Sequence, residues 1–300
     1  MRSFKLTFRF TGDPTVKRLR WVVIGAILFS IANTLAGQPP SFWHAPETAV
    51  RFDGLSIHSQ TNPMFDFFLG LGWQAYLGAT LLYLAAVFLL VSLLPRRAAL
   101  AAAFSFIFGH YFGASSWLGH RWHFGVEGAV LYAIVLSTVV ALLAFPEIEA
   151  TGPIEATGAL VRQLRWVVLA AAALDFAITL LGQPGSYWLH PETANEANDL
   201  FRIFLARGWG AYLLFDLLYL LGIFLLVSNL GRLAALVCTF SFLFGHVMGL
   251  STWLFYRWRM GMEGPAIYGA IVSVAIVSLA FADAGKQPMH FRYSLCNCDG

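Results

Sequence analysis

Two histidines occupy equivalent places in a pattern that occurs twice in the sequence. The pattern is Gly-His-x-x-Gly-x-Ser-(Ser/Thr)-Trp-Leu; it covers residues 109–118 and 245–254, with His110 and His246 in second position. An ionisable side chain at membrane depth is costly unless it faces a bundle interior. One interpretation is that the two histidines approach each other at the axis between the halves and together bind a haem iron, a pigment metal or another ion. The structural alternative is that the glycines allow close helix packing while each neutral imidazole hydrogen-bonds a neighbouring helix.

Charged residues near the ends of the apolar runs form a second repeated set. An arginine guanidinium can bind a carboxylate or phosphate through two parallel hydrogen bonds, which predicts a vestibule for a polar or charged ligand. The alternative is that each arginine pairs with two carboxylates and holds a long loop over the helix ends. The set consists of Glu47, Arg121 and Glu127 in the first half and of Glu192, Arg257 and Glu263 in the second.

Two carboxylates have no acidic counterpart in the first half. Asp175 aligns with Ser30, and Asp216 aligns with Thr80. Carboxylates inside a membrane can carry protons or cations, so this pair suggests a proton-coupled transporter. The alternative is hydrogen bonding to a nearby hydroxyl group, on Thr179, Tyr212 or Tyr219.

The composition indicates that these residues lie in a membrane. Hydrophobic residues make up 58% of the 300 residues, charged residues make up 12%, and the mean hydropathy is +0.68. A soluble domain carries roughly a quarter charged residues. The net charge is +3 and the basic residues are scattered, which argues against a nucleic-acid partner.

The second half of the chain repeats the first. All 10 tryptophans fall into matched pairs, and the run FSFIFGH at 104–110 returns as FSFLFGH at 240–246. The register shifts once, because the first half has extra residues around 51–59. We interpret the chain as a tandem duplication. The tryptophan pairs are Trp21 with Trp166, Trp43 with Trp188, Trp73 with Trp209, Trp117 with Trp253, and Trp122 with Trp258.

These observations predict an all-α integral membrane protein of eight transmembrane helices. Four helices form a repeat at 20–145 and four form a second repeat at 165–282, flanked by a basic segment at 1–19, a linker at 146–164 and a tail at 283–300. Because each repeat has an even number of spans, the two are parallel and related by a pseudo-two-fold axis along the membrane normal. Apolar run lengths place the spans near 20–37, 73–94, 98–118, 128–145, 165–182, 209–230, 233–254 and 264–282.

The basic residues set the expected orientation. Thirteen of the 19 Lys and Arg residues fall on the side that holds the N-terminus, the linker and the tail. Basic residues in short loops are retained in the cytoplasm, so both termini are predicted to be cytoplasmic.

Three functions agree with this pattern. The first is binding or transport of a small solute or hydrophobic cofactor between the two repeats, without catalysis. The second is a non-catalytic accessory subunit of a larger membrane complex or a homo-oligomer, in contact with the lipid bilayer. The third is an intramembrane enzyme, which the absence of known catalytic motifs makes less favoured.

Overall fold

The computed structural model describes residues 12–49, 63–145, 154–196 and 198–281, and every regular element within these ranges is helical. Eight helices are long and apolar enough to cross a membrane, which confirms the number of spans predicted from the sequence. The chain is therefore a polytopic membrane protein. The eight helices are α1 (Pro14–Ala36), α3 (Trp73–Leu93), α4 (Arg96–His120), α5 (Gly125–Ala144), α6 (Ile154–Leu181), α8 (Trp209–Asn229), α9 (Arg232–Tyr256) and α10 (Glu263–Ala280).

Several predicted segments lie outside the described residues: 1–11 of the N-terminal segment, the extra residues at 51–59, the linker from 146 to 153 and the tail at 283–300. Two helices begin earlier than predicted. α1 begins at Pro14, because the Asp13 side chain accepts a hydrogen bond of 3.0 Å from the backbone N–H of Val16 and caps the helix. α6 begins at Ile154, so its first turns occupy the second part of the segment predicted as a linker.

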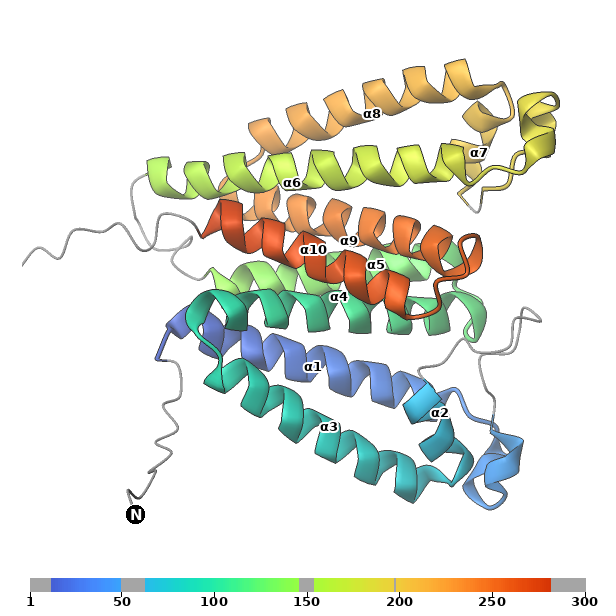
Figure 1. Ribbon diagram of the computed structural model, residues 1–300. Coiled ribbons are helices and arrows are strands. Elements are labelled where there is room, and N and C mark those ends of the chain that lie inside the picture. The colour runs from blue at the N-terminus through green and yellow to red at the C-terminus, as the bar shows by residue number, and fades with distance from the viewer. Residues whose placement is uncertain (1–11, 50–62, 146–153, 197, 282–300) are drawn as a thin grey trace, which may run out of the picture.

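The helices form one bundle with four central spans and two outer pairs (Figure 1). α4, α5, α9 and α10 lie in the centre, α1 and α3 flank them on one side, and α6 and α8 on the other. α4 packs against α10, and α5 packs against α9, so the central spans of the two halves are interleaved.

Phenylalanine rings fill the contact between α4 and α9. Phe104 and Phe240 stack with their ring centroids 5.9 Å apart, and Phe108 and Phe244 follow one turn later at 5.1 Å. All four side chains are almost completely buried. The seam between the halves is therefore apolar and aromatic along this stretch.

The same succession of short elements connects α1 to α3 and α6 to α8. In each connection two 3₁₀ helices precede a short α-helix, and a glycine with positive φ precedes the next span. Gly72 and Gly208 have φ of +107° and +104°, a conformation that L side chains rarely adopt. The short elements are η1 (Pro40–Trp43), η2 (Pro46–Thr48), α2 (Pro63–Gly70), η4 (Gly185–Trp188), η5 (Pro191–Thr193) and α7 (Asp199–Leu205).

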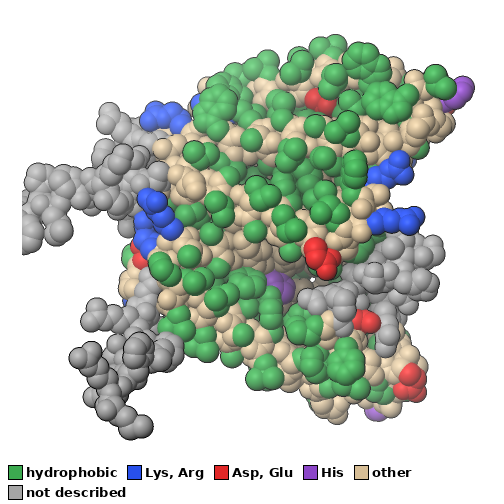
Figure 2. Space-filling model, viewed as in Figure 1, with side chains coloured by type: hydrophobic (Ala, Val, Ile, Leu, Met, Phe, Trp, Pro, Cys, Tyr) green, Lys and Arg blue, Asp and Glu red, His purple; other side chains and the backbone are tan. Residues whose placement is uncertain are grey.

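The outer surface of the bundle is apolar. Leu82 on α3 is 75% exposed and Leu217 on α8 is 66% exposed. Hydrophobic side chains spread across the face shown in Figure 2, while Lys and Arg side chains lie towards its two ends. Such a surface is stable only in contact with lipid, which identifies the bilayer as the surroundings of these helices.

Candidate functional site: the His110 and His246 clusters

His110 on α4 lies in a hydrogen-bonded pair with a tyrosine of α3. Its Nε2 atom is 3.0 Å from the hydroxyl oxygen of Tyr83, and the two rings are in contact. Which atom donates depends on the histidine tautomer. The pair shows that His110 faces α3, within the first half of the chain.

A cavity of about 390 Å³ opens beside this pair. α1, α2, α3 and α4 supply most of its wall, and the ends of α9 and α10 close one side through Tyr256 and Ala266. Its polar lining includes His110 and Tyr83 and, in addition, Ser30, Thr34, Asp66, Tyr76, Thr80, Ser105 and Ser116. The first half thus contains a chamber with hydrogen-bonding groups inside the membrane-spanning region.

His246 on α9 has a different partner. Its Nδ1 atom is 3.0 Å from Oδ2 of Asp175 on α6, and both residues are more than nine-tenths buried. A Cβ atom added to Gly249 would lie 2.6 Å from the same Oδ2 atom, so this glycine leaves the space that the carboxylate occupies. At the equivalent place in the first half, a Cβ on Gly113 would be 4.0 Å from the Ser30 hydroxyl.

Asp216 on α8 lies near this pair and is 4% exposed. It lies one turn after Tyr212 on α8, and the ring of Tyr212 contacts Phe176, which also contacts His246. Within the described residues, neither carboxylate oxygen of Asp216 has a hydrogen-bond partner. Neither acid is therefore seen to bond to Thr179, Tyr212 or Tyr219, the hydroxyl partners expected from the sequence. Asp175 bonds to His246, and Asp216 has no partner among the described residues.

The space around His246 is filled by aromatic side chains. The ring of Phe176 contacts the rings of His246, Tyr219 and Tyr212 at centroid distances of 5.4 to 6.2 Å. The residue aligned with Phe176 is Ile31, which lines the first-half cavity. The second half thus has a larger side chain at this position and a carboxylate in place of Ser30. These two side chains occupy space that is open in the first half.

The two histidines are not brought together. Residues two positions apart on a helix point about 200° away from each other. Since Phe108 and Phe244 meet at the α4–α9 contact, His110 and His246 face away from it, each towards its own half. A haem or pigment metal held between the two imidazoles, as one interpretation of the sequence proposed, does not fit this geometry.

The two repeated arginines bind main-chain carbonyl groups. Arg121 Nε donates to the carbonyl oxygen of Gly37 at 2.6 Å, and Arg257 donates to that of Gln183 at 3.5 Å. These carbonyls lie one residue beyond the end of α1 and two residues beyond the end of α6, where free carbonyls and the helix dipole attract a positive charge. The arginines thus hold the ends of neighbouring helices, and carboxylate pairing predicted from the sequence is not what the described residues show.

Glu127 and Glu263 lie in the first turns of α5 and α10. A Cβ on Gly125 would be 2.7 Å from Oε2 of Glu127, and a Cβ on Gly261 would be 2.7 Å from Oε2 of Glu263. Each carboxylate therefore turns back over the start of its own helix, where the dipole favours a negative charge. These glutamates are separate from the histidine clusters.

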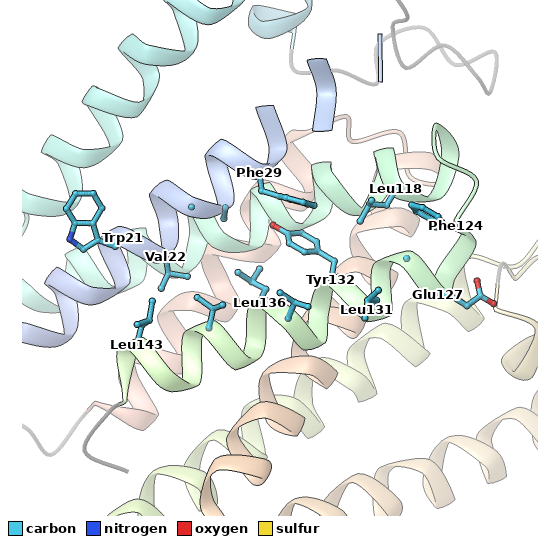
Figure 3. Close-up of a pocket in the computed structure, with 15 residues that line it drawn as sticks. Trp21, Val22, Phe29, Leu118, Phe124, Glu127, Leu131, Tyr132, Leu136 and Leu143 are labelled. Carbon is cyan, nitrogen blue, oxygen red and sulfur yellow. The ribbon is translucent and has the colours of Figure 1, made fainter. Parts of the chain in front are cut away.

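A third feature, a groove between α1 and α5, was not predicted from the sequence. It has a volume of about 560 Å³, and apolar side chains such as Val22, Phe29 and Leu136 form nearly all of its wall (Figure 3). Tyr132 carries its hydroxyl group into this wall beside Phe29, while Glu127 marks one end. Apart from Glu127, no charge or motif in the sequence distinguishes these residues from other apolar residues of the spans.

Fold and clusters together define a polytopic membrane protein with polar groups buried between its spans. In the described parts of the chain, no three His, Cys, Asp or Glu residues are arranged to hold a metal ion. The chain matches no protein-family model, no curated protein and no solved structure.

Proposed function

We propose that this protein binds or transports a small molecule through the first-half cavity and catalyses no reaction. One observation carries the proposal: the imidazole of His110 and the hydroxyl of Tyr83 line a cavity of about 390 Å³ between membrane spans. Ligand pockets of about 300–1,000 Å³ with a few convergent polar groups are typical of small-molecule sites.

The lining indicates the chemical class of the ligand. Apolar side chains such as Ile31 and Phe106 alternate with neutral hydroxyl groups, and Asp66 is the single acidic residue among those that form the wall. An anionic ligand would lose its hydration and meet no Lys or Arg in the wall, and the Asp66 carboxylate, the countercharge for a cation, already interacts with another group. The cavity therefore suits an uncharged molecule with an apolar body and one or two hydrogen-bonding groups.

The proposal can be tested by purifying the protein in lipid nanodiscs, extracting the molecules bound to it and identifying them by mass spectrometry. We expect a compound that wild-type protein retains and that Tyr83→Phe or His110→Ala reduces several-fold. Tyr219→Phe is the matched control, because Tyr219 occupies the aligned position outside this cavity. Equal retention by all variants, or no retained compound in the wild type, would overturn the proposal.

We also propose that the two halves are parallel repeats with both termini in the cytoplasm. Support comes from matched contacts: Arg20 donates to Ser92 at 2.6 Å and lies over Phe88, while Arg165 donates to Ser228 at 2.5 Å and lies over Phe224. Cysteine labelling at Glu47 and Glu192 should then occur from the same, external side. Labelling from opposite sides would exclude parallel repeats.

A second function, as an accessory subunit of a membrane complex, is favoured by the α1–α5 groove. Its wall includes Trp21, Leu131 and Val135, which are exposed despite lining a concave surface. Concave apolar surfaces of this size are used for binding. Native-gel migration in mild detergent separates the two functions, since a large co-migrating assembly supports the subunit and a lone monomer or dimer supports the first proposal.

A further inference from the structure

The second half contains a buried polar cluster that lies apart from the proposed ligand cavity. Asp175, Asp216 and His246 come from α6, α8 and α9, and each is at most 9% exposed. Four of their atoms are buried without a hydrogen-bond partner in the described part of the chain: Asp175 Oδ1, Asp216 Oδ1, Asp216 Oδ2 and His246 Nε2.

The charges around this cluster do not balance if both acids are ionised. The groups that interact electrostatically with the two carboxylates are His246 on α9, Tyr212 and Tyr219 on α8, and Tyr268 on α10. Glu196, before α7, also acts on Tyr212 and adds negative charge. Among these groups only His246 can carry a positive charge, and two carboxylates therefore exceed the available countercharge.

An uncompensated carboxylate inside a membrane protein is costly, because it loses its hydration and gains no partner. Bound protons remove this cost. A metal ion would need these side chains to converge on one point, and among the described residues no three His, Cys, Asp or Glu side chains are arranged to hold one. A proton needs a single carboxylate oxygen.

We propose that the second half contains a proton-binding site in which Asp216 is the exchangeable acid and the Asp175–His246 pair is its fixed neighbour. In the uptake step a hydronium ion transfers a proton to one carboxylate oxygen of Asp216: an O–H bond of the hydronium ion breaks, the carboxyl O–H bond forms, and a water molecule remains. Release returns the proton to water. This proposal does not depend on the identity of the ligand in the first-half cavity.

Polar groups lie on the side of the cluster that faces the segment before α7. Tyr212 hydrogen-bonds Thr179, and the side chain of Gln183 bonds the carbonyl oxygen of Thr179 at 3.0 Å. The same Gln183 side chain also binds the main chain of Asn195. These groups lie between the level of Asp216 and the segment before α7, and we expect protons to exchange from that side.

The first half supplies a natural control for this site. It keeps these polar groups, because Thr34, Gln38 and Tyr76 align with Thr179, Gln183 and Tyr212, but it has Ser30 and Thr80 where the second half has the acids. The variant Asp216→Thr therefore introduces a residue that the same fold already accommodates at the aligned position. Asp216→Glu keeps the acid and serves as the conservative variant.

Infrared difference spectroscopy on the full chain in lipid vesicles tests the proposal directly. Wild-type protein should show the carbonyl stretch of a protonated, buried carboxylic acid, which shifts in D₂O and disappears as the pH is raised. Asp216→Thr should abolish this band, Asp216→Glu should move it, and Asp66→Asn should leave it unchanged. Circular dichroism checks that each variant is folded. If Asp216→Thr does not fold, the shift of the band in Asp216→Glu tests the assignment of the band to Asp216.

Three results would overturn the proposal. The first is the absence of a protonated-acid band in the wild type, and the second is a band that neither shifts in D₂O nor responds to pH. The third is a band that survives in Asp216→Thr. The measurement is repeated with sodium chloride against N-methylglucamine chloride at constant pH: an unchanged band supports a proton site, and loss of the band in sodium would assign the site to a metal cation instead.

Discussion

His246 and Asp175 form a buried pair across α9 and α6, with Nδ1 3.0 Å from Oδ2. The aligned His110 instead uses Nε2 to meet the hydroxyl of Tyr83. The same position in two similar helices thus holds an imidazole beside an acid in one half and beside a neutral phenol in the other. This difference can be measured through the stability of matched variants.

The pair predicts a non-additive effect of substitutions on stability. His246→Ala leaves Asp175 buried without its partner, so we expect a loss of about 3 kcal/mol in the free energy of unfolding. Asp175→Ser combined with His246→Ala should recover part of that loss, because no unpaired acid remains. Unfolding in mixed detergent micelles measures the free energy of unfolding of the single and the double variant. The matched cycle with Ser30→Ala and His110→Ala should be additive within about 0.5 kcal/mol, and additivity in both halves would contradict the prediction.

Gly249 and Gly113 should respond differently to the same substitution. Gly249→Ala places a Cβ 2.6 Å from the Asp175 carboxylate, whereas Gly113→Ala places one 4.0 Å from the Ser30 hydroxyl. Overpacking of this kind costs about 1–3 kcal/mol, so Gly249→Ala should lower the thermal unfolding temperature and Gly113→Ala should leave it nearly unchanged. Adding Asp175→Ser should rescue Gly249→Ala. No rescue would mean that the carboxylate is not the obstacle.

Two further glycines, just after the ends of α1 and α6, allow tryptophans of α4 and α9 to pack closely against them. A Cβ on Gly37 would lie 2.7 Å from the ring of Trp117, and one on Gly182 would lie 2.5 Å from the ring of Trp253. Gly37→Ala and Gly182→Ala should each destabilise the protein by about 1–3 kcal/mol. Gly25→Ala is the control, since its Cβ meets nothing within 4 Å and alanine favours the helix. Equal unfolding temperatures for all three variants would show that the rings move aside freely.

Arg121→Ala should lower stability more than Arg257→Ala. Arg121 donates to Gly37 at 2.6 Å, while the bond of Arg257 to Gln183 is 3.5 Å long. Hydrogen bonds from charged groups contribute about 1.5–3 kcal/mol, and we expect the Arg121 variant to reach this range. Thermal unfolding and ligand retention should be measured together. Loss of retention with unchanged stability would instead support the vestibule interpretation of these arginines.

The spans themselves could be predicted from the sequence, because their apolar runs match the thickness of a bilayer and charged or Gly and Pro residues bound them. α3 and α8 begin and end within a residue of the predicted limits. α1 and α6 begin earlier, since a helix continues beyond the membrane wherever a cap or good helix formers permit it. Run length alone carries no information on that extension.

Partners across the bundle could not be predicted from the sequence. Asp175 and His246 are 71 residues apart, and Arg121 and Gly37 are 84 apart. Both arginine partners are carbonyl oxygens, which every residue has, so no side-chain pattern points to them. The sequence could, however, predict that His110 points away from Phe108, because the two residues lie two positions apart on a helix and face opposite sides.

The cavity of the first half is partly built by the second. Phe255 and Tyr256 at the end of α9, together with Met262 and Ala266 at the start of α10, form one side of its wall. A fragment that ended with α5 would lack this side of the wall, and the cavity would be wider open to the lipid. The second half of the chain thus supplies part of the wall of the first-half cavity and limits its opening to lipid.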